Sequence, residues 1–290
     1  MKHSTPPITI WIHGTKPQQL LPGRLAKIHI ESLYKFMHCE PGLHLAKDLN
    51  PSFHHFDLAQ ILHKTDPKNF PLETLYLFGW SGTLNAQDRL QAAQKLQKAL
   101  KVLVSEYEGI HHAKPFIRII AHSHGGNVAL NLAKIDTNKQ LHHAIVDELI
   151  LLACPVQKVT APLIKSPLFA KVYSLHSHWD FLQIADPQGW PQLKEHLRNF
   201  FKSQSLNDLK AGFVHVEQEP FFSERHFRPH SNLVQAVITI NGNHVLHIQF
   251  MLDSFVKNIP FILEKLSSLE TQKIQAEQEM FIDIPLEAIK

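Results

Sequence analysis

A serine flanked by small residues lies in the stretch 119–127, which reads Ile-Ile-Ala-His-Ser-His-Gly-Gly-Asn. Ala121 lies two positions before Ser123, and Gly125 lies two positions after it. An apolar, β-branched run precedes this stretch, and apolar residues at helical spacing follow it. A serine on so sharp a strand-to-helix turn has a strained backbone, and only small residues fit at those two positions. The pattern predicts an exposed serine nucleophile beside a helix N-terminus, where N–H groups stabilise an oxyanion.

Chemistry at this serine requires a base and an acid from elsewhere in the chain. A serine hydroxyl is a poor nucleophile at neutral pH unless a base within hydrogen-bond reach takes its proton. The base in turn needs a carboxylate, which holds its tautomer and stabilises its protonated form. Asp180 follows a strand predicted at 171–176, and His244 follows one at 234–240. Because ligands gather at the carboxyl ends of parallel strands, we expect both side chains near Ser123.

The small-x-Ser-x-small pattern and the chain order Ser, Asp, His resemble the α/β-hydrolase superfamily, in particular its lipase- and esterase-like serine hydrolases. The serine turn of that family usually reads Gly-x-Ser-x-Gly, and Ala121 takes the first glycine position here. The resemblance implies that Ser123 is the nucleophile, His244 the base and Asp180 the acid that orients it. It also implies an α/β-hydrolase fold.

Each partner of the serine has a rival nearby in the sequence. Asp186 precedes a proline, as turn-forming residues do, and we favour Asp180 because it lies nearer its strand. His244 directly follows the Gly-Asn turn, where the family places its base, whereas His247 lies closer to the terminal helix. We therefore favour His244 as the base and keep His247 and Asp186 as the alternative base and acid.

A loop near the N-terminus supplies candidates for the oxyanion hole. The strand predicted at 8–12 ends in a His-Gly-Thr sequence, and in hydrolases of this type a His-Gly pair after an early strand begins the oxyanion loop. Thr15 is our candidate N–H donor, with Gly14 as the alternative. The residue after the nucleophile, His124, supplies the second N–H.

Histidines are unusually frequent, with 22 in the chain, and several fall at the carboxyl ends of predicted strands. His13, together with Trp80 after the next strand, is a candidate substrate-binding residue at this rim of the sheet. Neutral imidazoles that converge there can hold a metal ion. The rim positions do not combine short histidine spacing with a carboxylate, as zinc enzymes do. We therefore expect no metal and no other cofactor.

Strands that are apolar throughout alternate with helices along the chain. This alternation predicts an α/β class with a mainly parallel sheet covered by helices on both faces. Further strands are expected at 74–78 and 148–153, a long amphipathic helix at 85–107, and a terminal helix at about 248–266.

We predict a single α/β-hydrolase domain over residues 1–266, followed by a C-terminal tail at 267–290. Two stretches without a clear central strand, about 16–71 and 186–232, are predicted to be insertions over the active-site face. Short helices are expected within the first of them, around 24–37 and 55–64.

Composition excludes several classes of protein. The 290 residues are 44% apolar, and their formal net charge is +3 with histidines neutral. Because the basic residues are scattered, we expect no nucleic-acid partner. Two cysteines are too few for a disulfide framework, and no apolar run approaches the roughly 18 residues of a transmembrane segment. No signal-peptide region precedes the first strand, so we expect a cytoplasmic protein.

The combined interpretation is a serine hydrolase that cleaves a carboxylic ester, either a small molecule or lipid-like, through an acyl-enzyme. A thioesterase or acyltransferase would use the same parts, and fold and triad do not select among these reactions. The alternative from another class is a non-catalytic binding protein of the same fold. The oligomeric state is left open.

Overall fold

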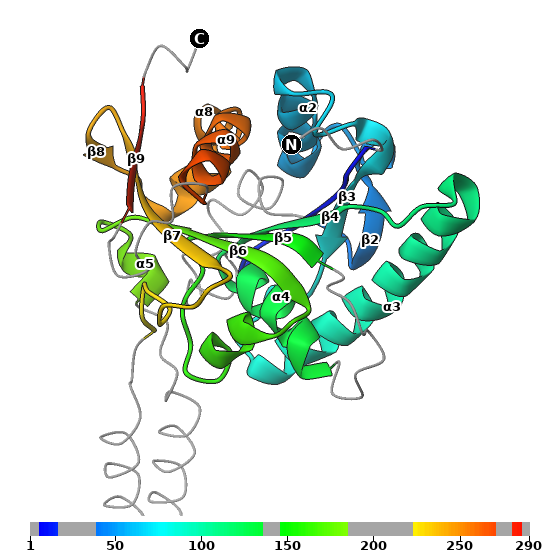
Figure 1. Ribbon diagram of the computed structural model, residues 1–290, viewed down its shortest axis with the longest axis horizontal. Helices are drawn as coiled ribbons and strands as arrows, with labels where there is room; N and C mark the ends of the chain where they lie inside the picture. The colour runs from blue at the N-terminus through cyan, green and yellow to red at the C-terminus, as the bar shows by residue number, and fades with distance from the viewer. Residues whose placement is uncertain (1–5, 17–38, 136–145, 185–222, 271–279, 286–290) are drawn as a thin grey trace, which may run out of the picture.

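The computed structural model describes residues 6–16, 39–135, 146–184, 223–270 and 280–285. Its centre is a nine-stranded sheet in the order β2-β3-β1-β4-β5-β6-β7, with β8 and β9 both paired to β7 (Figure 1). All pairs are parallel except β2–β3 and β7–β8. The strands are β1 (Ile8–Ile12), β2 (Gly42–Leu45), β3 (Leu75–Gly79), β4 (Ile117–His122), β5 (Val146–Leu152), β6 (Phe169–His176), β7 (Leu233–Ile240), β8 (Asn243–His244) and β9 (Met280–Ile284).

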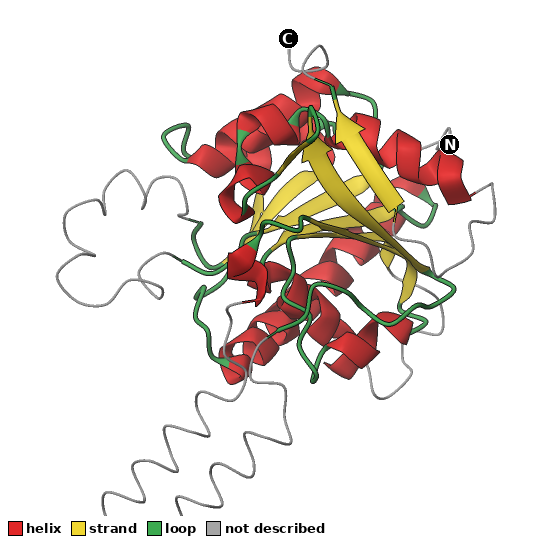
Figure 2. Cartoon of the chain, turned by 90° about the vertical axis from the view of Figure 1, so that its left-hand side faces the viewer, coloured by secondary structure: helices red, strands yellow, loops and turns green. Residues whose placement is uncertain are grey.

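Helices cover both faces of this sheet, which confirms the predicted α/β class (Figures 1 and 2). One face carries α3 (Ala86–His111) and α4 (His124–Ile135), and the other carries α2 (His54–Thr65), α8 (Asp253–Val256) and α9 (Ile259–Glu270). The shorter elements are η3 (Ala46–Asp48), η4 (Leu72–Thr74), η5 (Ala161–Lys165), α5 (Phe181–Ile184) and η6 (His247–Met251). Among the described helices, none has both the length and the apolarity that crossing a bilayer requires.

Alternating side chains of the central strands fill two separate apolar cores. Ile10 and Ile119 lie in the core under α3 and α4, whereas Trp11 and Ile120 lie in the core under α2 and α9. Successive residues of a strand point to opposite faces, so a strand between two helical layers must be apolar throughout. This requirement explains the continuous apolar runs in the sequence.

The order of the strands changes direction at one point in the sheet. The chain places β3 on one side of β1 and β4 on the other, and β5, β6 and β7 follow outward from β4. Loops that leave β1 and β4 at the carboxyl edge therefore diverge, and ligands of open α/β sheets bind in the crevice at such a point. The loop after β1 begins at His13, and Ser123 directly follows β4.

The described part of the first predicted insertion belongs to the layered fold. Strand β2 pairs with β3 at the edge of the sheet, and α2 buries Leu58 and Leu62 on one face. The four residues of β2 are all half-buried, so they do not form the continuous apolar run that predicts a buried strand, and the sequence does not predict β2. Helix α2 confirms the short helix predicted around 55–64. The helix predicted around 24–37 and most of the insertion at 186–232 lie outside the described residues.

The single terminal helix predicted at 248–266 is wrong, because the structure has η6, α8 and α9 in this range. Pro260 is the second residue of α9, at a helix start where its missing N–H costs no hydrogen bond. The tail at 267–290, predicted outside the domain, contributes β9 to the sheet, with Ile282 and Ile284 buried against β7.

The packing of α4 on the sheet can be tested at Gly126. A Cβ atom there would lie 2.9 Å from the Cβ of Cys154, just beyond β5. We expect Gly126→Val to lower the free energy of unfolding by about 1–3 kcal/mol, because α4 must move away from the sheet. Gly109→Ala in α3 is the control, since an added Cβ meets nothing within 4 Å. It should raise stability by up to about 1 kcal/mol through helix propensity. Denaturant unfolding of both variants measures this, and a neutral Gly126→Val would contradict the packing.

Candidate functional site

Ser123 occupies the sharp strand-to-helix turn that the sequence predicts, between β4 and α4. Its φ is +52°, in the left-handed region where a residue with a side chain is strained. The turn is fixed by two backbone hydrogen bonds, from the N–H of Ser123 to the carbonyl of Leu152 and from the N–H of Gly126 to the carbonyl of Ser123. A Cβ at Gly125 would lie 2.6 Å from the carbonyl oxygen of His13. Crowding at the crossing of β1 and the turn therefore requires the small residue.

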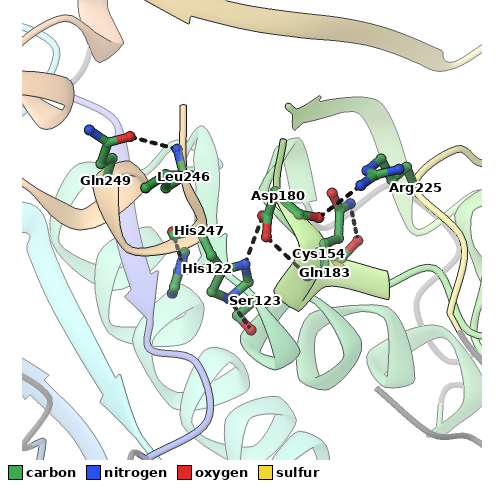
Figure 3. Close-up of polar contacts among 9 residues, drawn as sticks. All are labelled: His122, Ser123, Cys154, Asp180, Gln183, Arg225, Leu246, His247 and Gln249. Atoms are coloured by element: carbon green, nitrogen blue, oxygen red, sulfur yellow. Dashed lines mark hydrogen bonds and ion pairs between the residues drawn. The ribbon is translucent and has the colours of Figure 1, made fainter. Parts of the chain in front are cut away.

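A chain of hydrogen bonds links Ser123 to a histidine and a buried carboxylate (Figure 3). The Nε2 of His247 lies 2.9 Å from the Oγ of Ser123, and its Nδ1 lies 2.7 Å from the Oδ2 of Asp180. A carboxylate oxygen accepts, so Nδ1 carries the hydrogen and Nε2 can accept the serine proton. The Asp180 side chain is fully buried, and 14% of the His247 side chain is exposed.

His244, favoured from the sequence, does not make these contacts, and His247 makes them. Asn241 and Gly242 have φ values of +50° and +72° and form a two-residue hairpin turn. The chain therefore folds back as β8, where His244 pairs with Thr239. His247 comes three residues later, at the start of η6, and reaches the serine. An Asn-Gly pair is a hairpin signal, so the sequence did contain the feature that favours His247.

Asp180 is held by residues that the sequence analysis did not identify. The N–H of Gln183 donates to Oδ1 of Asp180 at 3.0 Å, while its side-chain amide donates to the carbonyl of Cys154 at 2.8 Å. The guanidinium of Arg225 donates to the carbonyl of Asp180 at 3.2 Å (Figure 3). No sequence pattern links these residues, because their contacts exist only in the folded chain. The rival acid, Asp186, lies outside the described residues.

Two of the predicted oxyanion residues, Gly14 and His124, lie beside the same serine. A Cβ at Gly14 would lie 2.8 Å from the Cβ of Ser123, so the loop after β1 touches Ser123. His124 begins α4, and N–H groups in a first helical turn have no partner within the helix. Thr15 is buried, and its hydroxyl has no hydrogen-bond partner in the described part of the chain.

His13 and Trp80, which the sequence predicts to contact substrate, are buried and hydrogen-bonded to each other. The Trp80 N–H donates to Nε2 of His13 at 3.0 Å, and the Trp80 indole donates to the carbonyl of His13 at 2.8 Å. Because Nε2 accepts, Nδ1 of His13 carries the hydrogen and donates to the carbonyl of Gly14 at 2.7 Å. These contacts hold the loop that carries Gly14 and Thr15.

Asn127, in the first turn of α4, joins the helix to the segment after β5. Its side-chain amide donates to the carbonyl of Pro155 at 3.0 Å, and its side-chain oxygen accepts from the hydroxyl of Thr160. The same amide nitrogen lies 3.3 Å from Nδ1 of His124. Asn127 belongs to the motif stretch, but its role depends on residues that no pattern connects to it.

His122, the last residue of β4, lies behind His247. Its Nε2 lies 3.1 Å from the carbonyl oxygen of His247, and the two ring centroids are 4.8 Å apart (Figure 3). Burial lowers the pKa of His122 well below its ordinary value, and the nearby imidazoles of His247, His55 and His13 lower it further. The hydrogen bond to the His247 carbonyl opposes this shift but is a smaller effect, so His122 is neutral.

The comparison with known proteins leaves the site to be interpreted from its own geometry. No protein-family model matches the chain, and no curated protein matches it significantly. Within the described ranges, no group of three or more His, Cys, Asp or Glu side chains is arranged to hold a metal ion.

The neutral state of His122 predicts how stability depends on pH. Its pKa in the folded chain is well below the ordinary 6.5, so below that pH the unfolded chain binds a proton that the folded chain does not. The free energy of unfolding therefore decreases as the pH is lowered below 6.5. The slope of this decrease approaches about 1.4 kcal/mol per pH unit. We expect His122→Gln to flatten this dependence in denaturant titrations at a series of pH values. His111→Gln, at an exposed position at the end of α3, is the control and should leave it as in the wild type. Equal pH dependence in wild type and His122→Gln would contradict a buried neutral imidazole.

Proposed function

We propose that the protein is a serine hydrolase of the α/β-hydrolase fold that cleaves carboxylic esters through an acyl-enzyme. The observation that carries the proposal is the hydrogen-bonded chain from Asp180 through His247 to Ser123. The strained turn at Ser123 supports it, because stored backbone strain is typical of functional residues. The position of the turn, where strand order reverses at the carboxyl edge, supports it as well.

In the proposed first step, the Oγ of Ser123 attacks the ester carbonyl carbon while its proton passes to Nε2 of His247. The carbonyl electrons move onto oxygen, and the N–H groups of His124 and of Thr15 or Gly14 stabilise the resulting oxyanion. Asp180, 2.7 Å from Nδ1, stabilises the imidazolium. When the tetrahedral intermediate collapses, the alkoxide leaves with the proton from His247, and an acyl-serine remains.

In the second step, water attacks the acyl-serine and gives a proton to Nε2 of His247. The oxyanion is stabilised as before, and collapse returns the proton to Ser123 and releases the carboxylic acid. Throughout both steps, the hydrogen bond from Nδ1 to Asp180 keeps His247 in one tautomer. The bond from the Gln183 N–H holds the carboxylate in position while this happens.

Exposed apolar side chains beside the acid and the base support an apolar substrate. Large apolar side chains are ordinarily buried, and exposed groups of them mark places where apolar ligands or surfaces bind. Trp179 and Phe181, which flank Asp180, are 60% and 67% exposed, and Leu246 and Ile248, which flank His247, are 49% and 44% exposed. Exposed apolar side chains next to both Asp180 and His247 favour an ester with a hydrocarbon part.

Covalent labelling tests the proposal directly. A fluorophosphonate reagent should label the wild type, and Ser123→Ala should not be labelled because only an activated serine reacts. Hydrolysis of p-nitrophenyl esters should fall by about 10³-fold or more in Ser123→Ala and in His247→Gln. His244→Gln should keep most of the activity, since His244 does not contact the serine. A series of esters of increasing chain length then identifies the preferred acyl group.

Two results would count against the proposal. Labelling that persists in Ser123→Ala would show that the reactive residue is not Ser123. Absence of labelling from the wild type favours a non-catalytic binding protein over a serine hydrolase. Activity that is lost in His244→Gln and kept in His247→Gln would overturn the choice of base.

The hydroxyl of Thr15 provides a test of the oxyanion loop. It is buried without a hydrogen-bond partner in the described structure, and an oxyanion beside it would supply an acceptor. We expect Thr15→Val to lower kcat by about 10- to 100-fold with little change in KM. Thr9→Val is the matched control, because Thr9 also carries a buried hydroxyl without a described partner, at the other end of β1. Steady-state kinetics should show no effect of Thr9→Val, and equal effects of both variants would exclude a role of the Thr15 hydroxyl in the oxyanion hole.

A further inference from the structure

Histidines from two other elements hold the two ends of η6, the segment that carries His247. The Nε2 of His122 lies 3.1 Å from the carbonyl oxygen of His247, the first residue of η6. The Nε2 of His54, at the start of α2, lies 2.8 Å from the carbonyl oxygen of Met251, the last residue of η6. A carbonyl oxygen only accepts, so both imidazoles donate from Nε2.

The two ends of η6 differ in what else anchors them. Phe250 and Met251 are fully buried, so the end of the segment is fixed in the apolar core. At the start, Leu246 and Ile248 on either side of His247 are exposed, and the nearest core residue before them is Val245. The two hydrogen bonds between Leu246 and Gln249 join η6 to the residue that precedes it, and they do not connect η6 to any other element (Figure 3). The bond from His122 therefore anchors the main chain at His247.

His122 also contacts the reactive side chain itself. Its ring centroid lies 4.8 Å from that of His247, and the ring planes are inclined by 51°. The remaining nitrogen of His122, Nδ1, is buried without a hydrogen-bond partner in the described residues. A Cβ at Gly14 would lie 3.0 Å from this nitrogen, so the oxyanion loop closes over it. A bare, enclosed Nδ1 keeps His122 neutral, and a neutral ring does not repel His247 when His247 becomes an imidazolium.

We propose that His122 is a positioning residue, which fixes the main chain and ring of His247 so that Nε2 faces Ser123 and Nδ1 faces Asp180. This inference rests on the proposed function, because positioning matters only if His247 transfers protons. His54 holds the far end of the same segment, where the buried Phe250 and Met251 already anchor it. The position directly before the nucleophile thus acts on the base rather than on the substrate.

A pair of substitutions at His122 separates positioning from folding. His122→Leu keeps most of the volume and removes the donor, whereas His122→Gln places an amide N–H near the original Nε2. We expect His122→Leu to lower kcat by about 10- to 100-fold, since a small misalignment of reacting groups has effects of this size, and to leave KM within about 3-fold. His122→Gln should recover kcat to within about 5-fold of the wild type.

Nuclear magnetic resonance gives a second readout that needs no activity. The hydrogen between Nδ1 of His247 and Asp180 should give a low-field proton signal in the wild type and in His122→Gln. The signal should be lost or shifted in His122→Leu. Should His122→Leu fail to fold by circular dichroism, His122→Asn replaces it, because its shorter amide does not reach the His247 carbonyl.

The outcomes distinguish this inference from the proposed function. If the wild type shows no Ser123-dependent labelling, the hydrolase proposal fails, and the proton signal still tests whether His122 positions His247. If the wild type is active but His122→Leu has unchanged kcat and an unchanged proton signal, the positioning role is wrong. An equal loss of kcat in His122→Leu and His122→Gln would also overturn it, because the restored donor should rescue.

Discussion

The hydrogen bond of 2.7 Å between His247 and Asp180 joins two loops that are 67 residues apart in the chain. A buried carboxylate is costly unless hydrogen-bond donors surround it, so the folded state depends on bringing these loops together. Parallel pairing of β4, β5, β6 and β7 does this, because it directs the carboxyl ends of all four strands to one edge. The left-handed turn at Ser123 then projects the serine side chain toward His247 at this edge.

Much of this arrangement is predictable, because the signals are strong and local. The buried strands are continuous apolar runs, and the turn at Ser123 needs small residues that the sequence displays. The elements that the sequence does not predict are short or lie at an edge of the sheet. Strand β2 has only half-buried residues, and β9 is separated from the core strands by a polar stretch. The choice between His244 and His247 depended on a hairpin with a two-residue turn, which reverses the chain before His247 is reached.

The abundant histidines act here as connectors between segments. His13, His54 and His122 each have a ring nitrogen within hydrogen-bond distance of a main-chain carbonyl, those of Gly14, Met251 and His247 respectively. An imidazole can donate from one side and accept from the other, so it joins loops that have no regular ladder between them. Sequence reasoning could place these residues at the rim of the sheet. It could not identify their partners, because each partner is a carbonyl whose position is set by the fold.

Strand β9 connects the outer edge of the sheet to the segment that carries His247. The carboxylate of Asp283 accepts from the hydroxyl of Thr239 at 2.7 Å and from the N–H of Gly242 at 2.8 Å, so β9 fixes the hairpin that precedes η6. The same strand covers the backbone of β7, which would otherwise offer open hydrogen-bonding groups to other chains. The segment that provides this cover begins 40 residues after the end of β7, so the outer edge of β7 is exposed in any conformation in which β9 has not docked. Docking of β9 therefore does two things at once: it blocks intermolecular strand pairing, and it completes the hydrogen bonds of the hairpin before His247. A chain in which β9 has not docked is both open to aggregation and incomplete around His247.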